Sequence, residues 1–187
     1  MNTSSTTRKL TTMGLLVAIS IVLVWMIHFP IFPATAFLEY DPADIPIIFA
    51  TFLYGPLSGF LLTVITSVIQ GVTVSAQSGV YGIIMHIIAT GCYVLIAGLI
   101  HSKWKTLKGM IGALACGTLC TAAVMGVANI FITPLFMSVP TQAVMELLWP
   151  FIIPFNLIKM AVNSVFAALL YKGLEKTPFF GHHTAKY

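Results

Sequence analysis

The chain has 187 residues, of which 58% are hydrophobic and 7% charged, and its mean hydropathy is +0.99. Soluble domains carry about 25% charged residues, so this composition excludes a soluble globular protein and predicts an integral membrane protein. The formal net charge is +4, but its nine basic residues are scattered between apolar runs, which excludes a continuous nucleic-acid-binding patch.

The apolar runs predict an all-α bundle of six transmembrane helices that forms one domain over residues 1–187. A bilayer core of about 30 Å takes roughly 20 helical residues to cross. The expected spans are about 10–29, 45–56, 58–75, 80–100, 109–137 and 153–172. The second and third runs are short, so they form either two short crossings or one re-entrant hairpin. A loop with Pro140 and Pro150 is expected before the last span.

The basic residues indicate how such a bundle is oriented. With both termini in the cytoplasm, eight of the nine lie on the cytoplasmic side, as the positive-inside rule requires. These eight are Arg8, Lys9, Lys103, Lys105, Lys108, Lys172, Lys176 and Lys186. The same topology places Glu39, Asp41, Asp44 and Glu146 outside and Glu175 inside. The exception is Lys159.

Lys159 belongs to a polar stripe in the last span, because Asn156, Lys159 and Asn163 are spaced i, i+3, i+7 and share one helix face. Lys159 precedes Lys172 by thirteen residues, or roughly 20 Å of helix, which places it in the outer part of the membrane. A charge at that depth is costly and predicts a functional role. The alternatives are a lysine that snorkels to the outer interface and a stripe that only bonds neighbouring helices.

Other polar and aromatic residues fall in the same outer half and are candidates for one pocket. They are Asn129, Gln70, Gln77, Ser78 and Tyr81, together with outer-loop aromatics such as Tyr40. Aromatics there either stack on a planar ligand or form an interfacial belt. The external acids with His28 or His86 match no metal-ligand motif, and no hydrolase motif is present. We therefore predict neither a metal site nor an enzyme.

Small residues suggest where helices approach closely. Gly14 and Ala18 form a small-xxx-small pair in the first span, and Gly112, Cys116 and Cys120 repeat the spacing in the fifth. Such a face packs either within the bundle or against another subunit. There is no P-loop, so transport would draw its energy from an ion gradient or another subunit.

Four stretches together resemble the substrate-binding S components of energy-coupling factor (ECF) vitamin transporters of the riboflavin type. They are "GLLVAIS", "FPIFPATAFLEYDPADIP", "FLYGPLSGF" and "PFNLIK". The resemblance implies a six-helix protein of the bacterial plasma membrane that binds riboflavin as transported ligand, without a cofactor. It also implies docking on a transmembrane coupling subunit that is driven by two cytoplasmic ATPases.

The resemblance also implies roles for individual residues. Asn156 and Lys159 would hydrogen-bond the isoalloxazine ring, Asn129 would contribute from the fifth helix, and Gly14 and Ala18 would meet the coupling subunit. The remaining ligand-contact candidates are Leu38, Tyr40, Gln77, Tyr81, His86 and Asn163.

One position departs from the riboflavin pattern, since His86 stands where that type has an asparagine. This keeps open an S component for another vitamin or small planar molecule, such as pantothenate, thiamine or a modified purine. An ion-coupled carrier that works without an ATPase partner is the alternative from a different class.

Overall fold

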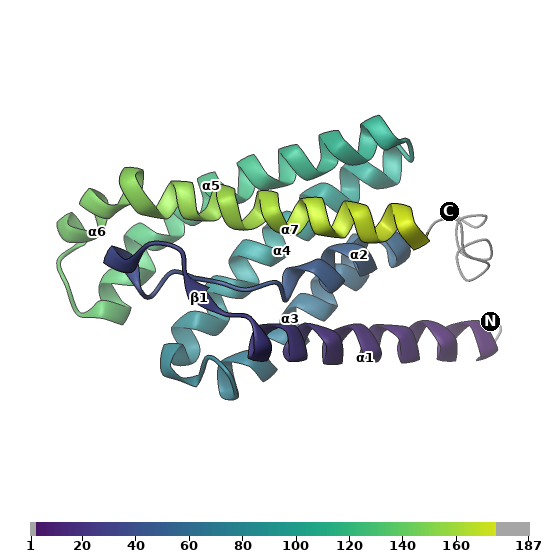
Figure 1. Ribbon diagram of the computed structural model, residues 1–187, viewed down its shortest axis with the longest axis horizontal. Coiled ribbons are helices and arrows are strands. Elements are labelled where there is room, and N and C mark those ends of the chain that lie inside the picture. Colours follow the sequence, from purple (N-terminus) through teal and green to yellow (C-terminus); the bar gives the residue numbers. More distant parts are fainter. Residues whose placement is uncertain (1–2, 175–187) are drawn as a thin grey trace.

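The computed structural model describes residues 3–174, which are almost entirely helical (Figure 1). Within these residues the α-helices are α1 (Thr3–Met26), α2 (Asp44–Tyr54), α3 (Pro56–Val72), α4 (Gly79–Lys103), α5 (Leu107–Met137), α6 (Thr141–Leu147) and α7 (Ile153–Leu174). The shorter elements are β1 (Phe29–Pro30), η1 (Pro33–Thr35), β2 (Glu39–Tyr40), η2 (Ala76–Ser78) and the π-helical turn η3 (Leu148–Ile152).

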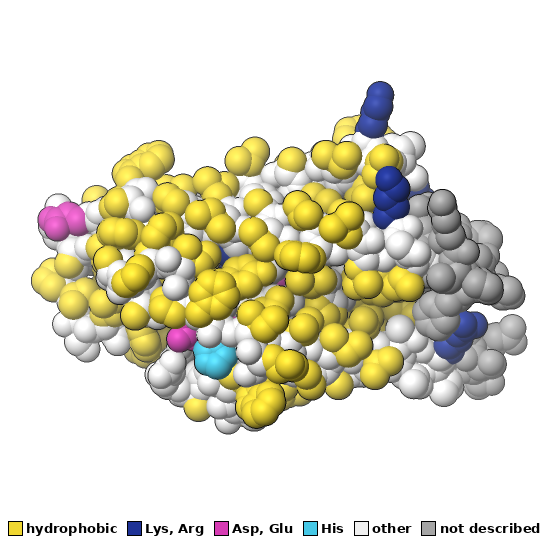
Figure 2. All heavy atoms as spheres, viewed as in Figure 1, with side chains coloured by type: hydrophobic (Ala, Val, Ile, Leu, Met, Phe, Trp, Pro, Cys, Tyr) yellow, Lys and Arg dark blue, Asp and Glu magenta, His cyan; other side chains and the backbone are white. Residues whose placement is uncertain are grey.

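An all-α membrane fold is confirmed. Within residues 3–174, four helical stretches are long and apolar enough to cross a bilayer, namely Thr6–Met26, Ala76–Lys103, Leu107–Met137 and Thr141–Leu174. Helices α2 and α3 are shorter. Hydrophobic side chains cover most of the face shown in Figure 2. Lys and Arg side chains gather at the end where α1 begins and α7 ends (Figures 1 and 2).

The short helix α2 begins deep inside the bundle. Ser20, in the second half of α1, donates a hydrogen bond of 2.9 Å to the carbonyl of Ala43. Asn163 of α7 donates at 3.1 Å to the carbonyl of Asp41. The turn formed by residues 41–43 therefore lies inside the bundle, and the 11 residues of α2 cover only the rest of the distance to the end where α1 begins (Figure 1).

Two helix ends in the structure are set by local backbone features and not by the length of the apolar run. The first helix ends at Met26 and not at residue 29, because Phe29 pairs with Tyr40 in a small antiparallel β-ladder. Gly55, at a φ of 88°, separates α2 from α3, and Pro56 occupies the first turn of α3, where its missing N–H costs nothing.

The expected loop around Pro140 and Pro150 is wrong. Helix α6 and the turn η3 fill this segment and continue directly into α7. Pro140 precedes the first turn of α6, where proline is tolerated. Pro150 lies in the π-helical turn, whose altered hydrogen-bond pattern accommodates a residue without an N–H.

Two apolar clusters hold the bundle together. The larger one packs α2 against its neighbours around fully buried Ile47, Leu62 and Tyr93. The smaller one joins the loop before α2 to α6 and α7, through Leu38, Val144, Ile152 and Phe155.

The predicted cytoplasmic position of Glu175, Lys176 and Lys186 concerns residues that lie outside the described part of the chain.

Candidate ligand-binding site

A pocket opens between the loop before α2 and helices α3, α4, α5 and α7. Six of the predicted ligand contacts line it, namely Leu38, Tyr81, His86, Asn129, Asn156 and Lys159. Tyr40 and Asn163 lie behind the wall, and Gln77 is exposed on η2. The wall also contains apolar side chains, among them Met85, Ile132, Phe136 and Phe155. The sequence thus identified most of one wall of this pocket.

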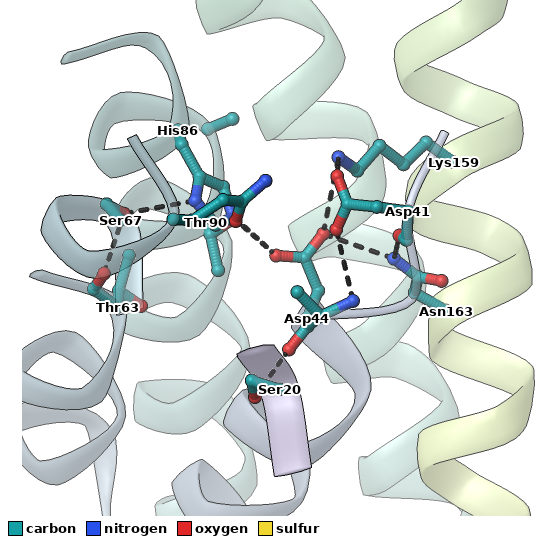
Figure 3. Close-up of polar contacts among 12 residues, drawn as sticks. Ser20, Asp41, Asp44, Thr63, Ser67, His86, Thr90, Lys159 and Asn163 are labelled. Atoms are coloured by element: carbon teal, nitrogen blue, oxygen red, sulfur yellow. Dashed lines mark hydrogen bonds and ion pairs between the residues drawn. The ribbon is translucent and has the colours of Figure 1, made fainter. Parts of the chain in front are cut away.

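Lys159 faces this pocket and is held by an acidic partner (Figure 3). Its Nζ donates to Asp41 Oδ2 at 2.7 Å and lies 4.0 Å from Asp44 Oδ2. Lys159 is 8% exposed, Asp41 5% and Asp44 0%. Snorkelling of Lys159 to the outer interface is therefore wrong, because the ammonium is bound inside the bundle.

Asp41 and Asp44, which were expected in an outer loop, are buried in the bundle beside Lys159. A lone ammonium buried in an apolar bundle is costly, and paired burial lowers that cost. Asp41 Oδ1 also accepts the backbone N–H of Ala43 at 3.0 Å, a turn that aspartate favours. Asp44 occupies the first turn of α2, where the helix dipole favours a negative charge.

Asp44 is the most connected acid of the cluster. Its Oδ1 lies 3.0 Å from His86 Nε2 and accepts from Thr90 Oγ1 at 2.7 Å. Its Oδ2 accepts from Asn163 Nδ2 at 3.1 Å. Figure 3 shows these side chains converging from α4 and α7 on the start of α2. This carboxylate therefore fixes the position of α2 against both helices.

Asn163 and Tyr40 connect the β-hairpin to the same cluster. Tyr40 donates its phenolic hydrogen to Asn163 Oδ1 at 3.0 Å. Burial, and next the charge of Asp41, raise the pKa of Tyr40, so the phenol stays a neutral donor at physiological pH. Both residues support Asp41 and Asp44 from behind, and their predicted direct contact with a ligand is not seen in the pocket lining.

Asn129 and Asn156 present their side chains to the pocket from α5 and α7. Each donates its amide to its own helix, Asn129 to the carbonyl of Met125 at 2.7 Å and Asn156 to that of Ile152 at 2.8 Å. Thr133 donates to Asn129 Oδ1 at 2.8 Å. The side-chain oxygen of Asn156 is thus the group it can offer to a donor on a ligand.

His86 contacts α3 as well as α2. Its Nδ1 lies 3.1 Å from Ser67 Oγ, and Ser67 donates to the carbonyl of Thr63 at 2.6 Å. Both ring nitrogens of His86 are therefore engaged by the protein. Gln70, near the end of α3, donates to Ser75 of the α3–α4 turn at 3.3 Å, and the two residues form a further polar wall of the pocket.

Asp41, Asp44, Ser67 and Thr90 were not among the predicted site residues. One signal could have revealed the acids, since an apolar run of about eleven residues is too short to cross. The residues before such a short helix can then be expected to pack inside the bundle, as Asp41 and Asp44 do.

Comparison with known proteins identifies the family of this chain. The family model described as "ECF transporter, substrate-specific component" matches residues 8–171. The riboflavin transporter FmnP of Bacillus subtilis (strain 168) is 28% identical over 176 residues, which cover 90% of this chain and 92% of FmnP. The riboflavin transporter RibU of Staphylococcus aureus (strain TCH60) is 28% identical over 173 residues, which cover 89% of this chain and 90% of RibU.

A solved structure, described as the S component of a bacterial ECF transporter, matches with a TM-score of 0.80. The sequences are 28% identical, and the match covers 90% of this chain and 96% of that one. The resemblance seen in the sequence is thus confirmed for fold and family. The chain is a multi-pass protein of the cell membrane and a transporter component, not an enzyme, and it belongs to the family of ECF transporter substrate-specific components.

Proposed function

We propose that this chain is a riboflavin-binding S component that takes up the vitamin in the pocket lined by Asn129, Asn156 and Lys159. The observation that carries the proposal is the side-chain set on one wall, where an amide oxygen and an ammonium group lie one turn apart on α7. The uracil-like edge of a flavin alternates carbonyl acceptors with an N–H donor. Asn156 can accept that hydrogen while Lys159 donates to a neighbouring carbonyl.

The charge of the pocket supports a neutral ligand. Lys159 is already paired with Asp41 at 2.7 Å, so this wall offers a directed donor and no unbalanced positive charge. A carboxylate ligand such as pantothenate would gain less there than at a free cation. The apolar wall formed by Met85, Ile132 and Phe136 suits the dimethylbenzene end of a flavin.

The proposed topology has six crossings of one domain, with both termini in the cytoplasm. Helices α1, α3, α4, α5 and α7 would cross, and α2 would complete a crossing with the non-helical segment before it. The basic residues at one end of the bundle then lie inside, as the positive-inside rule requires. They are Arg8, Lys9, Lys172 and the lysines at and beside the α4–α5 turn, Lys103, Lys105 and Lys108. The pocket opens toward the opposite, outer end.

The proposed partner is a transmembrane coupling subunit driven by two cytoplasmic ATPases. Gly14 and Ala18 are both exposed on α1, and no atom of residues 3–174 lies within 4 Å of a Cβ built on Gly14. Packing within the bundle does not use this face, so it is available for close approach of another helix.

An absorbance spectrum of the purified protein tests the ligand directly. Expression in riboflavin-rich medium should give a yellow preparation with the visible flavin band, and riboflavin should bind the ligand-free protein with quenching of flavin fluorescence. A colourless protein that leaves the fluorescence unchanged would refute the riboflavin assignment. Co-purification of the coupling subunit and ATPases with the tagged chain tests the partners separately.

A further inference from the structure

The buried acids beside the pocket outnumber the lysine that balances them. Asp41 and Asp44 carry two negative charges, while Lys159 contributes one positive charge, and all three are more than nine-tenths buried. A buried charge without a counter-charge costs several kcal/mol. A further positive charge among the neighbouring side chains would balance the cluster.

The groups that face His86 are few. From α2 it meets Asp44 at 3.0 Å and from α3 Ser67 at 3.1 Å. The pocket wall presents Asn129 from α5 and Lys159 from α7. The loop presents Asp41 and Glu39, of which Glu39 is only half-buried. Among these titratable neighbours, Asp44 is the group that His86 contacts directly.

The direction of each hydrogen bond around His86 can be assigned from the donors available. A carboxylate only accepts, so Nε2 must carry a hydrogen toward Asp44. A carbonyl also only accepts, so Ser67 gives its single hydrogen to Thr63 at 2.6 Å. The contact between Ser67 Oγ and Nδ1 then needs a hydrogen on Nδ1 as well. We infer that His86 is an imidazolium, which makes the buried cluster of Asp41, Asp44, His86 and Lys159 electrically neutral.

This charge has a consequence for ligand binding, which rests on the proposed riboflavin function. Lys159 Nζ lies between Asp41, at 2.7 Å, and Asp44, at 4.0 Å. If His86 loses its proton, Asp44 loses a positive partner and attracts Lys159 more strongly. The ammonium then turns from the pocket toward α2. His86 is thus a positioning residue for Lys159, and affinity for a neutral ligand falls as pH rises through its deprotonation.

The protonation state can be observed without any ligand. The full-length protein, labelled with ¹⁵N-histidine in detergent micelles, gives two ring-nitrogen signals for each histidine, and a His86→Gln sample assigns those of His86. At neutral pH both nitrogens of His86 should have the chemical shifts of protonated N–H groups. One nitrogen with the shift of an unprotonated ring would overturn the inference, whatever the protein binds.

Riboflavin titrations from about pH 6, where an ordinary histidine is partly protonated, to about pH 9 test the consequence. Wild-type affinity should fall by about tenfold or more across the range, as expected for loss of one hydrogen bond to a charged group. The His86→Gln variant should show a flat profile. Wild type with a flat profile would overturn the positioning role, whereas absence of riboflavin binding at every pH would instead contradict the proposed function.

Two further variants keep the test informative if His86→Gln does not fold. Ser67→Ala removes the acceptor of the Nδ1 hydrogen, so the midpoint of the pH profile should move to lower pH. Thr90→Val removes a neutral donor to Asp44, which leaves the carboxylate more dependent on the imidazolium, so the midpoint should move to higher pH. If the midpoints of both variants moved in the same direction, or did not move, the assignment of His86 as an imidazolium would be contradicted.

Discussion

Lys159 Nζ lies 2.7 Å from Asp41 Oδ2, although 118 residues separate them in the chain. This contact joins the last helix to the turn that precedes α2. Because both side chains are buried, neither can lose its partner without leaving a charge inside the bundle. The same lysine that faces the pocket therefore also holds the loop in place.

Replacing Lys159 should separate these two roles. In Lys159→Met the unpaired acids should reduce the free energy of unfolding by roughly 3–5 kcal/mol and riboflavin binding should be lost. The double variant Lys159→Met/Asp41→Asn removes one negative charge together with the positive one. Much of the stability should then return, while binding stays lost.

Thermal unfolding in detergent and riboflavin titration measure the two effects. Lys172→Met is the matched control, since Lys172 is exposed in the last turn of α7 and should change neither. Riboflavin binding by Lys159→Met at wild-type affinity would contradict the role of the ammonium in the pocket.

Two asparagines of α7 should respond differently because they face different groups. Asn156 lines the pocket, so Asn156→Ala should weaken riboflavin binding by about 10- to 100-fold, the effect of losing one or two hydrogen bonds. Asn163 binds Tyr40, Asp41 and Asp44, so Asn163→Ala should mainly lower the unfolding temperature. Titration of each variant, normalised to its folded fraction, distinguishes them. An equal loss of affinity in both variants would mean that Asn163 contacts the ligand.

Much of the pocket lining was predictable from the sequence, because Lys159 interrupts an apolar run. A charge in an apolar run is rare enough to be informative, and the helical period then assigned Asn156 and Asn163 to the same face. The family motifs added Asn129. What the sequence did not reveal was the partner of the lysine, because Asp41 and Asp44 lie in a polar segment that local hydropathy places outside the membrane.

In the fold, too, features that depend on local sequence were predictable, and features that depend on contacts between distant residues were not. Long apolar runs predicted α1, α4, α5 and α7 well, because a membrane helix satisfies its own backbone and depends little on its neighbours. The depth at which α2 begins depends on contacts made by Ser20 and Asn163. Helix α6 formed where two prolines suggested a loop, since Pro140 precedes the first helical turn and Pro150 lies in the π-helical turn that joins α6 to α7.

Glycine at position 98 should be required for the packing of α4 against the α2–α3 turn. A Cβ there would lie 2.7 Å from Thr51 Cγ2 and 3.0 Å from the backbone Cα of Pro56. Gly98→Ala should therefore destabilise the protein by about 1–3 kcal/mol, as overpacking does. Gly112→Ala is the control, because nothing lies within 4 Å of its Cβ and alanine favours a helix. Unfolding temperatures of the two variants should move in opposite directions, and a Gly98→Ala protein as stable as wild type would disprove the close approach.

The exposed small residues of α1 should matter for transport and not for ligand binding. Gly14→Leu adds a large side chain where this chain has empty space, so fold and riboflavin affinity should be preserved. If Gly14 and Ala18 meet the coupling subunit, the added side chain should separate the two helices, and both co-purification of the ATPase module and riboflavin uptake should be lost. Gly112→Leu makes the same change on the small-residue face of α5, at a position equally free of described neighbours, and retained transport in that variant would assign docking to the face of α1 alone. Uptake by Gly14→Leu at the wild-type rate would exclude this face of α1 from the docking interface.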